Sequence, residues 1–315
     1  MTKHRYDPEF QQALLDLLPT VTDLGDPAVL TEMRENGLEK LMPAPDRDDV
    51  ELEDRSIPGP DGAPDVPIRI YRPRTDTPVR AAVYEIHGGG FVMGSIAMMD
   101  AWSMEVAASL DALVVAVGYR LAPEHPFPAG VEDCYAGLSW LAADADPLGV
   151  DPERIAIAGQ SAGGGLAAAT ALLARDRGGP RLCFQLLEIP ELDDRLDTPS
   201  MQAFVDTPLW NRPNAVWSWR HYLGPDHRGE VSLYAAPARA EDLSRLPPAF
   251  VSTMEFDPLR DEGIIYAQRL MQAGVSVELH NYPGTFHGSA LFTQADVSKR
   301  GIRDAMAALG RALRG

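Results

Sequence analysis

The chain has 315 residues and a formal net charge of −18, from 28 Lys+Arg against 46 Asp+Glu. This charge argues against binding to nucleic acid or to an anionic membrane surface, because both need clusters of Lys and Arg. The two cysteines, Cys134 and Cys183, are too few for a disulfide framework or a four-cysteine zinc site. The segment 1–19 lacks the apolar core of a signal peptide. We therefore expect a soluble cytoplasmic protein with both thiols buried and reduced.

Amphipathic patterns predict two helices near the start of the chain, over Pro8–Leu18 and Val29–Met42. From Val66 on, short Val/Ile/Ala-rich runs alternate with helical patterns. The predicted strands are Val66–Tyr71, Ala81–His87, Leu113–Tyr119, Arg154–Ala158, Leu182–Glu188, Ala249–Met254 and Val275–Tyr282. The predicted helices are Ala101–Leu110, Gly130–Ala143, Ala162–Arg175, Arg260–Ala273 and Thr293–Leu313. This alternation predicts an α/β fold whose mostly parallel sheet is covered by helices on both faces.

The interval from Pro190 to Pro247 breaks the alternation, since it contains no clear strand pattern. It holds a Trp-rich helical pattern over Pro208–Leu223, in which Trp210 and Trp217 would share one helix face. Such an insertion, together with the N-terminal helices, suggests a lid over the carboxyl ends of the strands, where ligands bind in open α/β sheets. The Trp side chains either pack inside this lid or stack on the substrate, and both alternatives indicate an apolar lid.

The sequence Gly159-Gln160-Ser161-Ala162-Gly163 lies between a predicted strand and a predicted helix. A G-x-S-x-G pattern alone is weak evidence and also fits an ordinary glycine-rich turn. In a sharp strand–turn–helix, however, the glycines leave room for a strained serine whose hydroxyl is presented at the end of the strand. Ser161 is therefore the candidate nucleophile.

His87-Gly88-Gly89-Gly90 follows another predicted strand. Consecutive glycines allow several backbone N–H groups to point at one spot. Together with the N–H of Ala162, which begins a predicted helix, they can stabilise the oxyanion of a tetrahedral intermediate. A merely flexible loop would explain neither the histidine nor the order of the motifs.

A serine nucleophile needs a base and a carboxylate that orients the base. Asp257 and His287 each lie just past the end of a predicted strand, as the candidate nucleophile does. Glu255 and Asp261 are weaker candidates for the carboxylate. His280 lies inside a predicted strand and is interpreted as structural.

In these motifs the chain resembles the hormone-sensitive-lipase-like branch of the α/β-hydrolases, whose bacterial carboxylesterases carry HGGG and GxSAGG. The matching blocks are 87–91, 119–129 (YRLAPEHPFPA), 159–165, 257–262 (DPLRDE) and 286–288. The resemblance implies an α/β-hydrolase fold with a helical cap. The expected boundaries are 1–50 and 195–225 for the two parts of the cap, and 51–194 and 226–315 for the two parts of the core.

The resemblance also implies roles for individual residues. The implied triad has Ser161 as nucleophile, His287 as general base and then acid, and Asp257 as the residue that orients it. The implied oxyanion hole comprises Gly88, Gly89, Gly90 and Ala162. The candidate substrate contacts are Phe91, Glu191 and Trp210. Glu191 belongs to the acidic cluster 188–194, which is either a solvated turn or a pocket wall that attracts cationic esters.

The expected function is that of a serine carboxylesterase acting through an acyl-enzyme on short-chain esters, from acetyl to about hexanoyl, of small alcohols or phenols. The segments 186–196 and 204–219 also resemble esterases that deacetylate small aryl and alkyl esters, which suggests acetylated alkaloids such as heroin as substrates. The alternatives are an amidase or lactonase with the same triad, or a non-hydrolytic receptor for a small ligand. We expect no metal or cofactor, a small-molecule ester as the binding partner, and a monomer or homodimer.

Overall fold

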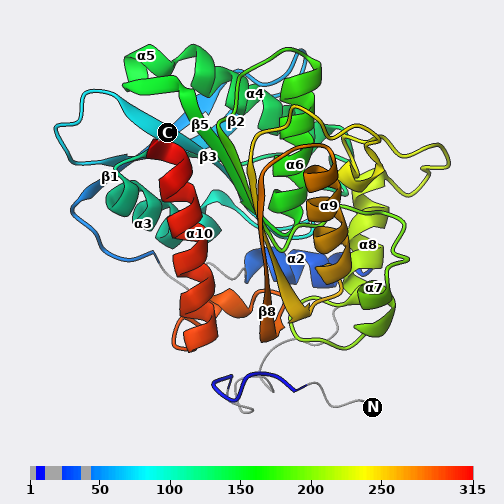
Figure 1. Cartoon of the computed structure of the whole chain (residues 1–315). Coiled ribbons are helices and arrows are strands. Elements are labelled where there is room, and N and C mark those ends of the chain that lie inside the picture. The colour runs from blue at the N-terminus through cyan, green and yellow to red at the C-terminus, as the bar shows by residue number, and fades with distance from the viewer. Residues whose placement is uncertain (1–4, 11–22, 37–43, 315) are drawn as a thin grey trace.

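The computed structural model describes residues 5–10, 23–36 and 44–314, and in this part of the chain the strands form one eight-stranded sheet (Figure 1). Its order is β1-β2-β4-β3-β5-β6-β7-β8. The strands are β1 (Val50–Ile57), β2 (Val66–Pro73), β3 (Arg80–Ile86), β4 (Leu113–Val117), β5 (Val150–Gln160), β6 (Phe184–Glu188), β7 (Ala249–Phe256) and β8 (Val277–Phe286). β2 pairs antiparallel with β1 and with β4, and the other neighbours pair in parallel. The carboxyl ends of β3, β5, β6, β7 and β8 therefore meet at one edge.

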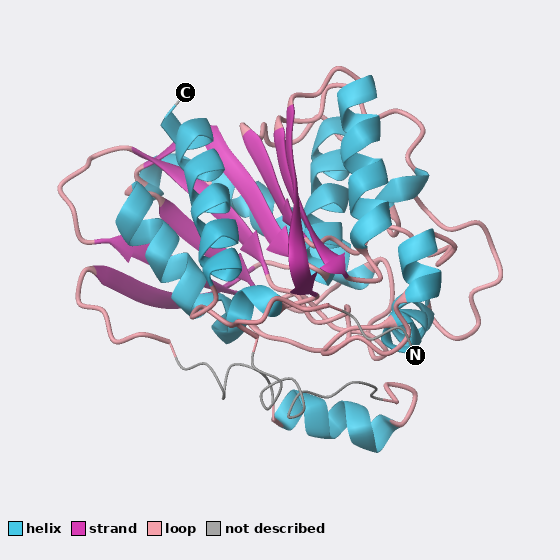
Figure 2. Cartoon of the chain, turned by 60° about the horizontal axis from the view of Figure 1, so that its bottom comes forward, coloured by secondary structure: helices cyan, strands magenta, loops and turns pink. Residues whose placement is uncertain are grey.

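Helices cover both faces of the sheet (Figure 2). α3 (Asp100–Leu110) and α10 (Asp296–Arg314) pack on one face, and α4 (Ala129–Ala143), α6 (Ala162–Asp176) and α9 (Arg260–Gln272) pack on the other. The remaining α-helices of the described chain are α2 (Pro27–Glu35), α5 (Ala145–Leu148), α7 (Pro199–Ala203) and α8 (Arg212–Leu223). None of the described helices is both long and apolar enough to cross a membrane.

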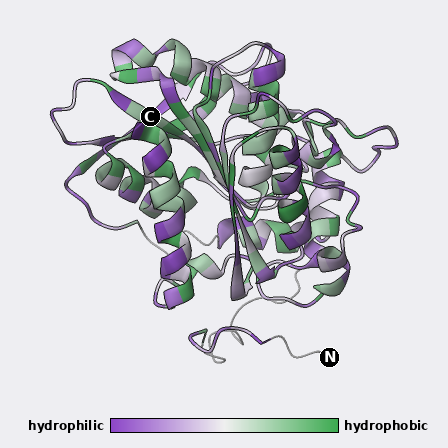
Figure 3. Cartoon of the chain, viewed as in Figure 1, coloured by the Kyte–Doolittle hydropathy of each residue, from purple (hydrophilic) through white to green (hydrophobic). Residues whose placement is uncertain are grey.

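Burial explains the composition of the central strands. Every residue of β3 and of β4 is buried, because helices cover both of their faces, and this favours near-continuous apolar runs. α10 is instead amphipathic: Ala305, Leu309 and Leu313 face the sheet, and charged residues alternate with them along the helix (Figure 3).

The predicted α/β class with a mostly parallel sheet is confirmed, and each strand and helix predicted between Val66 and Leu313 is present with shifted ends. The prediction missed β1, because in VELEDRSI only Val50 and Ile57 are buried and the six residues between them are exposed. It also missed the short helices α5 and α7.

The structure describes the two predicted N-terminal helices only in part. Most of the predicted helix Pro8–Leu18 lies outside the described residues. The helix predicted over Val29–Met42 is α2, which begins at Pro27 after an Asp26 cap and ends at Glu35. Residues 37–43, where the prediction continued the helix, are not described.

α2 and the segment before it contact α8, which is distant in sequence. The Leu24 carbonyl lies 2.7 Å from His221 Nε2, and Gly25 packs so closely on Trp217 that a Cβ atom there would lie 2.3 Å from the indole ring. Leu24, Leu30 and Ala215 share one apolar cluster with Val92, which follows β3. The two helices thus meet beside the strand ends that carry the predicted motifs.

Candidate active site

Ser161 occupies a sharp turn between β5 and α6. Its backbone angles, φ 57° and ψ −122°, lie in a sparsely populated region for a residue with a side chain. The flanking glycines permit the turn: a Cβ atom would lie 2.3 Å from the Gly163 carbonyl oxygen if placed on Gly159, and 2.1 Å from the Ile86 carbonyl oxygen if placed on Gly163. The G-x-S-x-G spacing is therefore a packing requirement of this strand–turn–helix.

Three side chains from different strand ends form a continuous hydrogen-bonded line. His287 Nε2 lies 2.9 Å from Ser161 Oγ, and His287 Nδ1 lies 2.8 Å from Asp257 Oδ2. The other oxygen of Asp257 accepts the Leu259 N–H at 2.9 Å. Asp257 is fully buried, and the serine and histidine are 8% and 7% exposed. Such a nucleophile, base and carboxylate can support acyl transfer.

The competing acids and the competing histidine have other partners. Glu255 accepts the Gly284 N–H at 2.6 Å, and Asp261 accepts the Ser200 N–H at 2.7 Å. His280 contacts Glu278 on β8 and stacks on Phe250. The structure therefore brings together the three residues that the sequence favoured.

The glycine-rich loop 87–90 is held through its carbonyl groups. The Tyr119 hydroxyl donates to the His87 carbonyl at 3.0 Å, and the two rings stack at 4.3 Å. His87 Nδ1 lies 2.8 Å from the Gly88 carbonyl, which can only accept, so Nδ1 carries the proton. Burial lowers the pKa of His87 to about 4, so this side chain is neutral at pH 7.

The next two carbonyls of the loop are also held. The Gly89 carbonyl accepts from the N–H groups of Val92 and Met93 at 3.1 and 3.0 Å, and the Gly90 carbonyl accepts from the Ser218 hydroxyl at 2.9 Å. Because the C=O and N–H of a trans peptide point in opposite directions, fixing the carbonyls of residues 88 and 89 fixes the N–H groups of residues 89 and 90.

Within the described chain, the N–H groups of Gly89, Gly90 and Ala162 donate to no protein acceptor. Ala162 is the first residue of α6, where the helix dipole favours negative charge. Gly88 lies close to the nucleophile, since a Cβ atom there would lie 2.9 Å from the Gln160 carbonyl oxygen. These N–H groups can stabilise an oxyanion that forms next to Ser161.

Trp210 lies beside the candidate nucleophile and base. Its ring centroid is 5.9 Å from that of His287, and its indole would lie 2.4 Å from a Cβ atom on Gly90. The expectation that it shares a helix face with Trp217 is wrong, because α8 begins only at Arg212. Asn211 caps the helix by accepting the Asn214 N–H, which excludes residue 210 from it.

Phe91 and Glu191 are buried, so neither presents its side chain to solvent. Phe91 is 2% exposed and stacks on Tyr222 of α8 at 4.0 Å. Glu191 is 0% exposed, and its carboxyl lies 3.0 Å from the hydroxyl of Ser218. This position corrects both alternatives for Glu191, since it lies neither in a solvated turn nor on an open pocket wall. Cys183 likewise departs from expectation because it is half-buried, whereas Cys134 is buried.

Three residues that support the site were missed in the sequence. Arg34 of α2 donates to the carbonyls of Val92 and Ala122, both at 2.7 Å. Ser218 of α8 holds the glycine-rich loop, and Glu262 of α9 accepts the backbone N–H groups that follow Glu191. Of these three residues, only Glu262 could have been found from the sequence, since it ends the block DPLRDE that matches the family.

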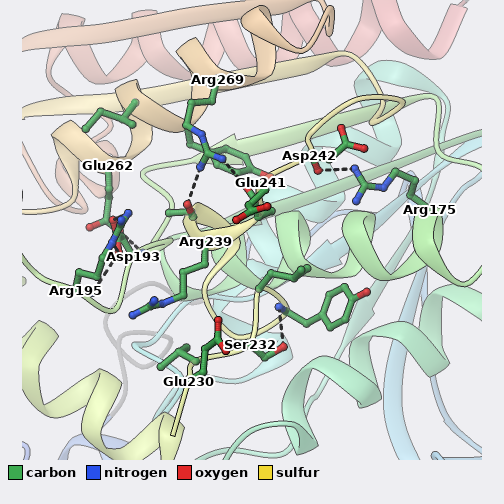
Figure 4. Close-up of a pocket in the computed structure, with 17 residues that line it drawn as sticks. Arg175, Asp193, Arg195, Glu230, Ser232, Arg239, Glu241, Asp242, Glu262 and Arg269 are labelled. Atoms are coloured by element: carbon green, nitrogen blue, oxygen red, sulfur yellow. Dashed lines mark hydrogen bonds and ion pairs between the residues drawn. The ribbon is translucent and has the colours of Figure 1, made fainter.

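A separate surface cavity of about 980 Å³ lies between α6, α9 and the segment 230–242 (Figure 4). Ser161, Asp257 and His287 do not line it, whereas Glu262 does. Its four arginines already have protein partners: Arg195 and Arg239 pair with Asp193 and Asp194, and Arg175 and Arg269 donate to backbone carbonyls. Their charge therefore stabilises this part of the fold.

The chain is similar to known proteins in both sequence and structure. A family model described as alpha/beta hydrolase fold matches residues 83–291. Carboxylesterase NlhH of Mycobacterium tuberculosis is 42% identical over 315 residues, which cover 95% of this chain and 94% of that protein. An arylesterase of Saccharolobus solfataricus is 40% identical over 81% of this chain and 83% of its own. A solved structure described as Bacterial Heroin Esterase is 52% identical, with a TM-score of 0.94 over 99% of both chains.

Proposed function

Since the chain belongs to the hormone-sensitive-lipase-like branch of the alpha/beta hydrolases and is a carboxylic ester hydrolase, we propose that it hydrolyses short-chain esters through an acyl-enzyme on Ser161. The observation that carries this proposal is the line of contacts from Ser161 Oγ through His287 to Asp257, at 2.9 and 2.8 Å. The substrates are esters of small alcohols or phenols, with acyl groups from acetyl to about hexanoyl.

In the first step His287 Nε2 takes the proton of Ser161 as its Oγ bonds to the ester carbonyl carbon. The N–H groups of Gly89, Gly90 and Ala162 bind the oxyanion, and Gly88 lets the loop approach the nucleophile. The C–O bond to the alcohol then breaks, and the alcohol leaves with the proton held by His287. Water repeats the sequence on the acyl-enzyme and releases the acid.

Bulky side chains beside the site support the preference for short acyl groups. Trp210 packs between Gly90 and His287, and Leu209 packs on Gly288. The name of the 52% identical heroin esterase supports acetylated alkaloids among the substrates. Trp210 is the substrate contact that we retain, whereas Phe91 acts through its stacking under α8.

The proposal is tested with p-nitrophenyl esters from acetyl to decanoyl, with Ser161→Ala as the blank. We expect a burst of p-nitrophenol equal to the enzyme concentration if deacylation limits turnover, and kcat/KM that falls beyond hexanoyl. Turnover no greater than that of Ser161→Ala would overturn the nucleophile assignment. A kcat/KM that is higher for the decanoyl than for the acetyl ester would overturn the chain-length assignment. The cytoplasmic location and the monomeric or dimeric state stay predictions.

A further inference from the structure

The hydroxyl of Ser218 on α8 lies between two oxygen atoms. Its Oγ is 2.9 Å from the Gly90 carbonyl oxygen and 3.0 Å from Glu191 Oε1. A hydroxyl has one proton and can donate only one hydrogen bond at a time. Both contacts can be hydrogen bonds only if the carboxyl of Glu191 supplies a second proton.

The surroundings of Glu191 favour this acid form. The side chain is fully buried, and its Oε2 has no hydrogen-bond partner within the described part of the chain. An ionised carboxylate with one oxygen unpaired would carry a large desolvation cost there. The groups that interact electrostatically with it are Asp257, Glu262 and Tyr119, and none of them is a cation. Burial, aided by the charge of Asp257, raises the pKa of Glu191 to about 8.

We propose that Glu191, as a neutral acid, and Ser218 are positioning residues for the oxyanion loop. Glu191 donates its proton to Ser218 Oγ, and Ser218 donates its own to the carbonyl of Gly90. This inference rests on the proposed function, because it assigns the loop to oxyanion binding.

The pair matters because it holds a residue with an unusual backbone conformation. Gly90 has φ 57°, and its preceding peptide is fixed by Val92 and Met93. Ser218 fixes the peptide that follows, so hydrogen bonds hold the peptides on both sides of Gly90 and with them the backbone angles of this residue. Loss of the Ser218 bond frees one side of this residue.

Ionisation of Glu191 would reverse the direction of the hydrogen bond between Glu191 and Ser218. The carboxylate would accept the single proton of Ser218, and the Gly90 carbonyl would lose its donor. Activity should therefore fall as the pH rises through the titration of Glu191. The carboxyl of Glu191 has no hydrogen bond to Ser161 or His287 within the described chain. Its charge does act on Asp257, and its backbone N–H, which does not titrate, donates to the Ser161 carbonyl at 3.0 Å.

The experiment compares kcat and KM for p-nitrophenyl acetate from about pH 6 to about pH 9. In Ser218→Ala we expect kcat to fall by about 10-fold or more with little change in KM, because misplacing an oxyanion donor affects the transition state. Ser139→Ala is the matched control, since the Ser139 hydroxyl donates only to Tyr135 within α4. The amide of Glu191→Gln can still donate to Ser218 but cannot titrate. This variant should keep kcat within about threefold at pH 7 and lose the alkaline decline of the wild type.

Each outcome decides a separate question. An inactive wild type contradicts the proposed function. An active wild type with equal kcat in Ser218→Ala and Ser139→Ala overturns the positioning role. The same alkaline decline in Glu191→Gln as in the wild type, or no decline in either, overturns the assignment of the proton to Glu191. If Ser218→Ala does not fold, the pH profile of Glu191→Gln still decides.

Discussion

Replacing Glu191 by Gln should remove part of the pH dependence of stability. In the folded chain burial holds the pKa of Glu191 at about 8, whereas the ordinary value is 4.5. Between these two values the folded state therefore binds one proton more than the unfolded state. Stability falls with rising pH wherever the folded state binds more protons. The destabilising effect is absent below about pH 4.5 and complete above about pH 8.

The size of the effect follows from this one proton. It corresponds to about 1.4 kcal/mol per pH unit, hence about 3 kcal/mol between pH 5 and pH 7. The free energy of unfolding of the Gln variant should rise relative to the wild type by this amount over that range. Glu188, whose pKa burial raises to about 7, contributes to both proteins and so largely cancels in the comparison.

The measurement is denaturant unfolding of both proteins at pH 5, 6 and 7, with free energies extrapolated to water. Glu230→Gln is the control, because Glu230 is exposed and its replacement leaves the hydrogen bond between Glu191 and Ser218 intact. The free energy of unfolding of this control, plotted against pH, should run parallel to that of the wild type. Parallel curves for the wild type and Glu191→Gln would refute the reasoning, because they would mean that Glu191 is ionised in the folded chain at these pH values.

Further predictions concern the triad, the turn and the contact with α2. Asp257→Asn should lower kcat by about 10⁴-fold with a smaller change in KM, because the amide cannot stabilise the protonated His287; steady-state kinetics tests this. Gly163→Ala should reduce the yield of folded protein, since its Cβ would lie 2.1 Å from the Ile86 carbonyl oxygen; wild-type yield and melting temperature would contradict this. Arg34→Gln should lower the free energy of unfolding by about 2 kcal/mol through the loss of its hydrogen bonds to two loop carbonyls, as denaturant titration would measure.

The proposed catalytic triad was predictable because its assembly depends on chain order and strand ends. Parallel strands place their carboxyl ends at one edge, so Ser161, Asp257 and His287 could be expected to meet once their strands were recognised. β1 could not be found in the same way. It pairs with β2 at the edge of the sheet, and only its two end residues are buried, so its sequence carries no alternating pattern.

The residues that hold the oxyanion loop could not be predicted, because their contacts join distant parts of the chain. Ser218 reaches Gly90 across 128 residues, and Arg34 reaches Val92 across 58. The surroundings of Glu191 were misjudged for a related reason. In the sequence it belongs to an acidic cluster, but the fold buries it fully against α8, where the neutral form is favoured.

These contacts make the helices beside the site part of its geometry. Arg34 of α2 and Ser218 of α8 donate to carbonyls within three residues of one another, at Val92 and Gly90. α2 and α8 also meet through Leu24 and His221. A cover that only excluded water would need no hydrogen bonds to the loop beneath it. Because both helices hold the loop directly, displacing either one should disturb the orientation of the oxyanion donors, and hence kcat, even where the space for the substrate is unchanged.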